Sequence, residues 1–296
     1  MRPLLGCLLS LGLAVQAAET VAPSPSRRIE VHGHRGARAV LPENTLAAFA
    51  EALRVGVDVL ELDLVATKDD VLVVSHDQEV NRTLCLGPGG KKVRGPIPIR
   101  SLTVNEVQSY DCGSLKNPRF PKQKPVPGER IPTLDEVFRM VLGSEHPAAK
   151  TVRFNIETKI VPARPELSPT PGRFAKLVVD AVRKHGLAGK VIVQSFDYRT
   201  LAAVKELAPE IKIAVLISEN LPDLPAIAEA LGAEIISPNH RWITKEEVRR
   251  LQEQGVRVVP WTVNEEDDWI RMLEYGVDGI ITDDPERLID FLSKRR

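Results

Sequence analysis

The sequence predicts an α/β fold, a (β/α)8 or TIM barrel, with a β-hairpin arm after the second strand and a small inserted subdomain. Apolar runs with β character alternate with amphipathic helical stretches along the chain, which is typical of a parallel sheet covered by helices. The length of 296 residues suffices for one such barrel, which often needs about 250 residues. The hydrophobic content of 43% and the charged content of 27% are those of an ordinary globular domain.

The alternation can be followed segment by segment. Strand character is expected at residues 29–34, 60–65, 71–76, 152–159, 191–196, 211–217, 234–238, 256–263 and 279–282. Helices are expected at residues 45–55, 133–142, 172–185, 198–207, 222–231, 245–254 and 266–275. Thr133 is a suitable N-cap, and Gly186, Gly232, Gly255 and Gly276 are typical helix stops. The barrel domain is therefore expected to span residues 29–296.

The second and third strand segments must form an antiparallel hairpin. Only residues 66–70 separate them, and a parallel crossover needs about a dozen residues. A two-residue turn at Asp69-Asp70 would place Lys68 opposite Val71 and Asp63 opposite His76. Without the returning arm, eight parallel strands remain, each followed by a helix.

One long segment interrupts the rhythm. Residues 82–132 are rich in proline and glycine and contain no long periodic run, and a connection of about 50 residues is far longer than usual. We expect an inserted subdomain there. A second irregular loop follows the strand at 152–159, and loops after barrel strands form the active-site face. Both loops are therefore expected to overhang the site.

The first 18 residues read as a signal peptide. Arg2 supplies the basic start, residues 4–15 form an apolar run too short to span a bilayer, and Val15-Gln16-Ala17 is an acceptable cleavage box. The alternative is an uncleaved anchor. We expect an exported protein, periplasmic or secreted, with no stable membrane insertion after cleavage.

Export affects the reading of the cysteines. Cys7 would leave with the signal peptide, whereas Cys85 and Cys112 both lie in the inserted segment. In an oxidising compartment two such cysteines suggest a disulfide bridge. The alternative is a pair of free, buried thiols.

The equal numbers of basic and acidic residues bear on which ligands the protein could bind. Lys and Arg number 40, as do Asp and Glu, which gives no support for nucleic-acid binding or for attachment to an acidic membrane. A local phosphate site needs only a few cations. A small-molecule substrate is therefore expected.

Ionisable residues gather where the predicted strands end. Because successive side chains of a strand alternate between its faces, residues two apart point the same way. Buried charges at such positions are costly unless they pair or bind something. The ionisable residues concerned are His34, Arg35, Glu61, Asp63, His76, Glu157 and Lys159, and the neutral Asn155 shares a face with the last two.

Three of these residues suit a metal ion. Glu61, Asp63 and Glu157 offer only oxygen ligands, which hard divalent cations such as Mg²⁺ or Ca²⁺ prefer. The alternative is a set of salt bridges at the barrel rim. Several ionisable groups at the ends of three strands favour a functional site.

The remaining four suit phosphoryl transfer. Of His34 and His76, one can deprotonate a nucleophile while the other protonates the leaving oxygen. Arg35 and Lys159 can stabilise the charge on a phosphate. A lone histidine would more often be an ordinary core residue, but here two histidines accompany the carboxylates.

The ordered motifs resemble those of the glycerophosphodiester phosphodiesterase family, a group of phospholipase C-like TIM barrels. The similarity covers nearly the whole chain after the signal peptide. The motifs are His34-Arg35-Gly36-Ala37, Pro42-Glu43-Asn44-Thr45, Glu61-Leu62-Asp63, Thr67-Lys68-Asp69, His76-Asp77, Asn155-Ile156-Glu157-Thr158-Lys159, Ser195-Phe196, Trp261-Thr262-Val263-Asn264 and Gly276-Val277-Asp278-Gly279-Ile280-Ile281-Thr282-Asp283.

The resemblance implies a hydrolase that needs a divalent metal ion. It would cleave glycerophosphodiesters such as glycerophosphocholine and glycerophosphoethanolamine to sn-glycerol 3-phosphate and an alcohol. The family roles fall on the residues named above, and Phe196 and Trp261 match aromatic positions near the glycerol. Asp70 departs from the pattern, because the family usually has Gly there.

The resemblance also suggests a catalytic route, and two other functions are alternatives to it. By analogy with related barrel phospholipases, His34 would deprotonate the glycerol 2-hydroxyl, His76 would protonate the departing alcohol, and water would open a cyclic phosphate. One alternative is a phospholipase C- or D-like enzyme that acts on lysolipids or inositol head groups. The other is a barrel that binds glycerophosphates without catalysis.

Overall fold

The computed structural model describes residues 28–295. The expected signal peptide, residues 1–18, and Cys7 lie outside the described residues. Within residues 28–295, no helix is both long and apolar enough to cross a membrane.

The strands of the described residues form a nearly closed TIM barrel. Eight of them run parallel in the order β10-β9-β8-β7-β6-β2-β1-β11, and β3 pairs antiparallel with β2. Backbone hydrogen bonds join the two ends of this order: Asp278 N donates to Val258 O over 2.9 Å and Ile281 N to Pro260 O over 3.0 Å. The strands are β1 (Glu30–Gly33), β2 (Val59–Ala66), β3 (Leu72–Val74), β6 (Arg153–Thr158), β7 (Val191–Ser195), β8 (Lys212–Ile217), β9 (Ile235–Pro238), β10 (Arg257–Val258) and β11 (Gly279–Thr282).

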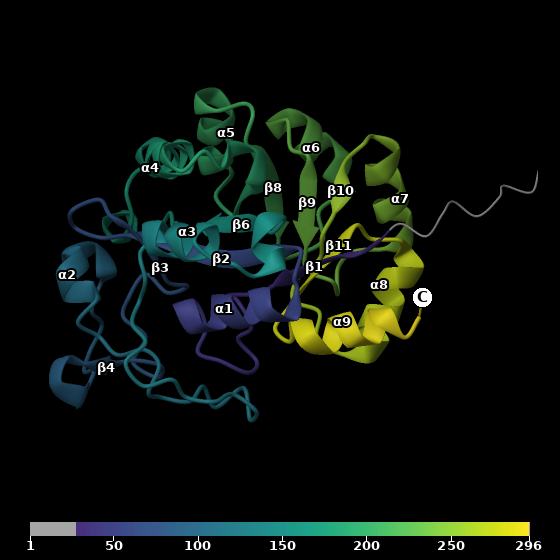
Figure 1. The fold of residues 1–296 in the computed structure, drawn as a ribbon. Coiled ribbons are helices and arrows are strands. Elements are labelled where there is room, and N and C mark those ends of the chain that lie inside the picture. Colours follow the sequence, from purple (N-terminus) through teal and green to yellow (C-terminus); the bar gives the residue numbers. More distant parts are fainter. Residues whose placement is uncertain (1–27, 296) are drawn as a thin grey trace, which may run out of the picture.

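Helices surround the strands on the outside of the barrel (Figure 1). They are α1 (Leu46–Val55), α3 (Leu134–Leu142), α4 (Pro171–Lys184), α5 (Tyr198–Leu207), α6 (Leu224–Leu231), α7 (Lys245–Glu253), α8 (Glu266–Tyr275) and α9 (Pro285–Ser293). Of these, the sequence reading did not locate α9. Thr133 caps α3 and Thr244 caps α7 in reciprocal capping boxes with a glutamate three residues on.

Alternation along β2 positions the site. All eight residues of β2 are buried, and Leu60, Leu62 and Leu64 pack into the large apolar core with the helices. Because side chains alternate, Glu61 and Asp63 face the interior of the barrel. A smaller apolar cluster fills that interior with Ile192, Ala214, Ile235, Val259 and Ile281.

The predicted register of the hairpin was wrong by one residue. Leu64 pairs with Val74, and Ser75 N donates to Asp63 O over 3.0 Å. Ser75, rather than His76, therefore lies opposite Asp63.

The reason is a three-residue loop, 68–70, closed by the pairing of Thr67 with Val71. Asp70 adopts a left-handed conformation with φ of 59°, as the last residue of such loops does. Its carboxylate lies 2.6 Å from Arg100 and 2.8 Å from Arg173. Contacts from distant segments thus hold a conformation for which glycine is usually chosen.

The inserted segment packs beside the hairpin through a cluster of its own. It contains the short elements β4 (Leu86–Gly87), β5 (Lys91–Lys92) and α2 (Val104–Val107). Cys85 and Cys112 are joined by a disulfide across 27 residues. Both cysteines lie in an apolar cluster with Val65 and Val73 of the hairpin. The segment is thus attached to the barrel by apolar contacts.

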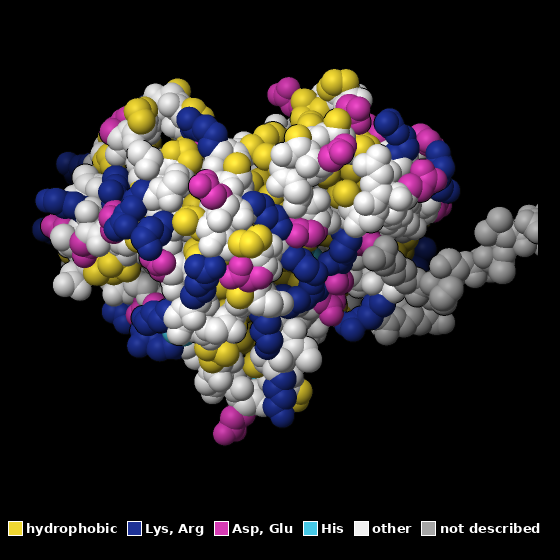
Figure 2. Space-filling view, turned by 90° about the horizontal axis from the view of Figure 1, so that it is seen from above, with side chains coloured by type: hydrophobic (Ala, Val, Ile, Leu, Met, Phe, Trp, Pro, Cys, Tyr) yellow, Lys and Arg dark blue, Asp and Glu magenta, His cyan; other side chains and the backbone are white. Residues whose placement is uncertain are grey.

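The molecular surface carries charges of both signs. On the face seen in Figure 2, Lys and Arg side chains are interspersed with Asp and Glu. This mixture matches the equal totals of 40 basic and 40 acidic residues.

Candidate active site

A cavity of about 650 Å³ opens at the carboxyl ends of the strands. His34 follows β1, Glu61 lies in β2, and Lys159 follows β6. His76 reaches the same cavity from the segment after β3. The structure therefore brings together groups that lie up to 125 residues apart in the sequence, from His34 to Lys159.

The three predicted metal-ligating carboxylates form one cluster. Glu61, Asp63 and Glu157 are all buried, and one oxygen of each lies within 4.8 Å of the others. Burial and the neighbouring carboxylates raise the pKa of Glu61 well above its ordinary value. Burial also raises the pKa of Glu157. Such crowding is costly without a cation, so the residues present fit a divalent metal ion.

Two cations border this cluster. Lys159 Nζ lies 2.6 Å from Glu157 Oε1 and 3.0 Å from Asp63 Oδ1. Arg35 Nε lies 3.1 Å from Asp63 Oδ2, and another guanidinium nitrogen lies 2.6 Å from Glu43 Oε1. Burial opposes the ionisation of Asp63, but Lys159 and Arg35 outweigh it and hold its pKa well below the usual range.

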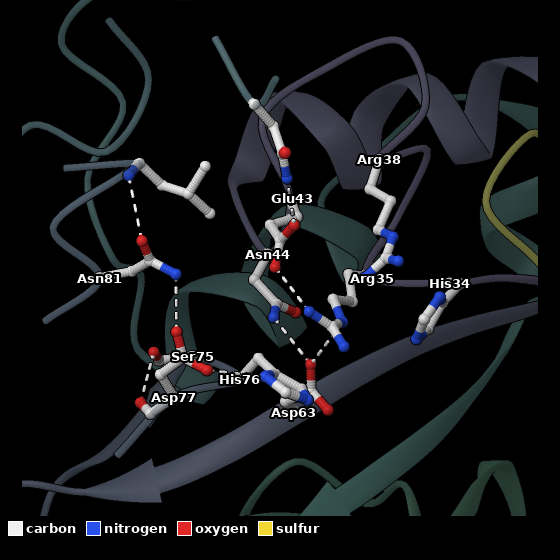
Figure 3. Close-up of polar contacts among 12 residues, drawn as sticks. His34, Arg35, Arg38, Glu43, Asn44, Asp63, Ser75, His76, Asp77 and Asn81 are labelled. Atoms are coloured by element: carbon white, nitrogen blue, oxygen red, sulfur yellow. Dashed lines mark hydrogen bonds and ion pairs between the residues drawn. The ribbon is translucent and has the colours of Figure 1, made fainter. Parts of the chain in front are cut away.

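Neutral side chains orient the same carboxylates. Asn44 Nδ2 donates to Asp63 Oδ2 over 2.9 Å (Figure 3). Gln194 Nε2 donates to Glu61 Oε1 over 2.8 Å, and Arg35 N donates to Glu61 Oε2 over 2.9 Å. Sequence reasoning gave no role to either amide. Asn44 stands in a quoted motif, whereas Gln194 could be suspected only as a polar residue in a buried strand.

His34 is held by a buried carboxylate from the other end of the chain. His34 Nδ1 lies 2.6 Å from Asp283 Oδ1, and Nε2 lies 3.9 Å from Glu61 Oε2. Arg38 Nε shares Asp283 Oδ1 at 2.7 Å, and Asn264 donates to Oδ2 over 2.8 Å. Burial and Arg38 lower the pKa of His34 to about 4, although Asp283 acts in the opposite direction. The imidazole is therefore neutral near pH 7, as a general base must be.

His76 is more open. Its side chain is 38% exposed, and Nδ1 lies 2.9 Å from Asp77 Oδ1. Asn81 donates to the other oxygen of Asp77 over 2.6 Å (Figure 3). Each histidine thus has one ring nitrogen beside an aspartate. The aspartate beside His34 is buried, whereas the aspartate beside His76 is not. Although the predicted register of the hairpin was wrong, His76 still lines the cavity as predicted.

The two predicted aromatic residues also line the cavity. Phe196 and Trp261 meet edge to face with ring centroids 5.6 Å apart. Trp261 Nε1 donates to Ser237 O over 2.8 Å, which fixes its indole, while Phe196 is 44% exposed. A second cavity of about 660 Å³ adjoins the first at His76 and Lys159 and passes Val161 and Leu167.

Residues 34–287 match the model of the glycerophosphoryl diester phosphodiesterase family. The chain belongs to this family. A glycerophosphodiester phosphodiesterase from Caldanaerobacter subterraneus subsp. tengcongensis is 36% identical over 89% of this chain and 98% of its own. One from Bacillus subtilis is 31% identical over 89% of this chain and 86% of its own.

Solved structures show the same fold. A Silicibacter pomeroyi DSS-3 protein, provisionally assigned as a glycerophosphoryl diester phosphodiesterase, has a TM-score of 0.82 and 31% identity over 90% of this chain and 94% of its own. An Oleispira antarctica phosphodiesterase, solved with the product sn-glycerol-3-phosphate, has a TM-score of 0.72 and 23% identity over 89% of this chain and 96% of its own.

Family membership and the curated relatives make the chain an enzyme of the glycerophosphodiester phosphodiesterase class. The predicted family and the predicted TIM barrel are confirmed, and the alternative of a barrel that only binds glycerophosphates is set aside. The acidic cluster agrees with a divalent metal site. The roles of individual residues and the identity of the ion remain predictions.

Proposed function

We propose that this phosphodiesterase hydrolyses glycerophosphodiesters, such as glycerophosphocholine and glycerophosphoethanolamine, to sn-glycerol 3-phosphate and an alcohol. One observation carries the proposal: two histidines and two cations line one cavity with Glu61 and Glu157, which belong to a buried cluster of three carboxylates. The Oleispira antarctica phosphodiesterase was solved with the product sn-glycerol-3-phosphate, which agrees with this substrate class.

Glu61, Asp63 and Glu157 would hold the metal ion, Ca²⁺ or Mg²⁺. When bound, such an ion supplies positive charge that stabilises a developing alkoxide and the phosphate oxygens. Arg35 and Lys159 border the cluster and would bind the non-bridging oxygens of the phosphate.

His34 is our candidate for the base. Its Nδ1 donates to Asp283, which leaves Nε2 unprotonated and turned toward Glu61. Nε2 would take the proton from the glycerol 2-hydroxyl as that oxygen forms a bond to phosphorus. Asp283 would stabilise the imidazolium that results.

His76 is our candidate for the acid. It would give a proton to the oxygen of the head-group alcohol while the bond from that oxygen to phosphorus breaks. The product is a five-membered cyclic phosphate. Water would then open this ring, with the two histidines exchanging their roles. The second cavity adjoins His76, so it would receive the departing alcohol.

A product assay on glycerophosphocholine with and without chelator tests the proposal. We expect sn-glycerol 3-phosphate and choline in equal amounts, loss of activity in chelator, and its return with Ca²⁺ or Mg²⁺, because the ligand set is all oxygen. Full activity after metal removal, with the metal content checked by elemental analysis, would contradict the metal dependence. Release of phosphocholine would contradict the position of cleavage.

A further inference from the structure

A third histidine lines the catalytic cavity and has no part in the mechanism above. His240 follows β9, and only 6% of its surface is exposed. Its backbone N donates to Trp261 O over 3.0 Å, so it lies against the segment after β10 that carries an aromatic residue of the site. Both residues line the cavity that contains His34.

The order of strands tells which end of the substrate reaches His240. On one side of β1 lie β2 and β6, which lead to His76 and Lys159; on the other lie β11, β10 and β9, which lead to His240. If His34 deprotonates the glycerol hydroxyl and His76 protonates the head-group alcohol, the glycerol lies on the side of β9 to β11. The inference rests on the proposed function in this respect.

A hydrogen bond fixes the tautomer of the His240 ring. Arg271 Nη2 lies 3.1 Å from His240 Nδ1, and a guanidinium can only donate. Nδ1 must therefore accept, which leaves the ring proton on Nε2. Asp268 Oδ2 is 3.8 Å from the same nitrogen, too far for a hydrogen bond.

The surroundings also keep this ring neutral. Burial lowers the pKa of His240; Asp268 opposes the shift, while Arg271 and Arg241 add to it. His240 is thus a neutral donor through Nε2–H near pH 7. Among residues 28–295, none accepts a hydrogen bond from that nitrogen, although the residue lines the cavity. A ligand oxygen in the cavity would supply the missing acceptor.

We propose that His240 donates a hydrogen bond from Nε2 to the primary hydroxyl oxygen at the far end of the substrate's glycerol. His240 thereby selects glycerophosphodiesters over diesters that have the reactive 2-hydroxyl but lack the primary hydroxyl. It is a specificity-determining residue, held in the required tautomer by Arg271.

The test compares glycerophosphocholine with 2-hydroxypropyl phosphocholine, which keeps the reactive 2-hydroxyl and lacks only the primary one. We expect the wild type to favour glycerophosphocholine by about tenfold in kcat/KM, as for the loss of one neutral hydrogen bond. His240→Phe should reduce this ratio to near one, by losing activity on glycerophosphocholine alone. His240→Gln, which returns an N–H donor near the position of Nε2, should restore part of the ratio.

Controls separate this role from a structural one. His146→Phe, at a histidine that precedes β6 and lies outside the cavity, should leave the ratio unchanged. If wild type hydrolyses glycerophosphocholine but His240→Phe keeps the wild-type ratio, this inference alone fails. If the wild type hydrolyses neither diester, the proposed function fails and the inference with it.

A second measurement does not depend on catalysis. In ¹⁵N spectra, the ring signals of His240 are those that the wild type shows and His240→Phe lacks. Their chemical shifts should be those of a ring with protonated Nε2 and unprotonated Nδ1. Arg271→Met should allow the other tautomer and lower the substrate ratio in parallel. A His240 ring protonated on Nδ1 in the wild type would overturn the proposal, whether or not the substrate ratio had changed.

Discussion

The two catalytic histidine candidates differ in how their rings are held. The aspartate partner of His34 is buried and also bound by Arg38 and Asn264. The aspartate partner of His76 follows it directly in the sequence and is 43% exposed. A buried, multiply bound partner suits a base that must keep one orientation, whereas an open ring suits an acid that meets departing alcohols.

This difference gives a prediction for two variants. His34→Ala and His76→Ala should each reduce kcat on glycerophosphocholine by about 10²–10⁴-fold. On a glycerol phosphodiester with a nitrophenol leaving group, His76→Ala should be partly rescued, because nitrophenolate departs with little need of a proton. His34→Ala should gain nothing. Steady-state kinetics on both substrates provide the measurement.

Metal content and thermal unfolding serve as controls and should stay close to wild type. Near-normal kcat on glycerophosphocholine in either variant would disprove the acid–base pair. Equal losses on both substrates would leave the pair in place but refute the division of labour.

Sequence reasoning found the residues of the site whose positions follow from local rules. Glu61 and Asp63 could be paired on one face because a strand alternates its side chains. The contact between His34 and Asp283 spans 249 residues, and no local rule brings those two together. Such contacts depend on the pairing of β1 with β11 in the barrel, which local rules do not predict.

At the scale of elements, most boundaries were predicted to within one or two residues. The strand expected at 256–263 is the main exception, since β10 contains only Arg257 and Val258. Pro260 lacks an N–H group and interrupts the regular pairing, although its carbonyl still accepts a bond from β11. The predicted register of the hairpin was also wrong because of one residue. Asp70, in a left-handed conformation, makes the turn three residues long instead of two.

The disulfide between Cys85 and Cys112 closes a loop within the inserted segment. Replacing both Cys85 and Cys112 by serine should lower the free energy of unfolding by roughly 3 kcal/mol, through the loop entropy of the unfolded chain. Chemical denaturation of the two proteins measures the difference. The unreduced, denatured mature protein should show no free thiol, and titration of two thiols per chain would contradict the bridge.

An ion-pair cluster between α3 and α4 gives a prediction for pH. Lys184 and His185 lower the pKa of Asp135 to about 2, below the value near 3.9 of an unfolded chain. Its contribution to stability is therefore present above about pH 4 and is lost as the pH falls toward 2.

Asp135→Asn should therefore cost less than about 1 kcal/mol at pH 6, because the site is close to the surface. The difference from wild type should shrink as the pH approaches 2. Denaturation curves at several pH values test this, and a difference that grew on acidification would contradict it.

At the scale of the whole molecule, we propose that the protein is exported and loses its first 17 or 18 residues. The apolar run after Arg2 supports this, and the disulfide agrees with an oxidising compartment. Sequencing the N-terminus of the protein in the periplasm or medium should find a start after Ala17 or Ala18. A protein that begins at Met1 in the cytosolic fraction would contradict export.

The barrel places β1 and β11, the first and last strands of the described residues, side by side. β1 lies between β2 and β11. The proposed base, His34, therefore has no aspartate partner until Asp283 is synthesised 249 residues later. In a chain that is still emerging from the ribosome, or still passing through a translocation channel, Asp283 is not in place to orient the His34 ring. If His34 is the base, as proposed, the enzyme would become active only after β11 has formed and brought Asp283 to it. If the protein is exported as proposed, the unfolded chain would leave the phosphodiesters of its own cytoplasm intact before it crosses the membrane.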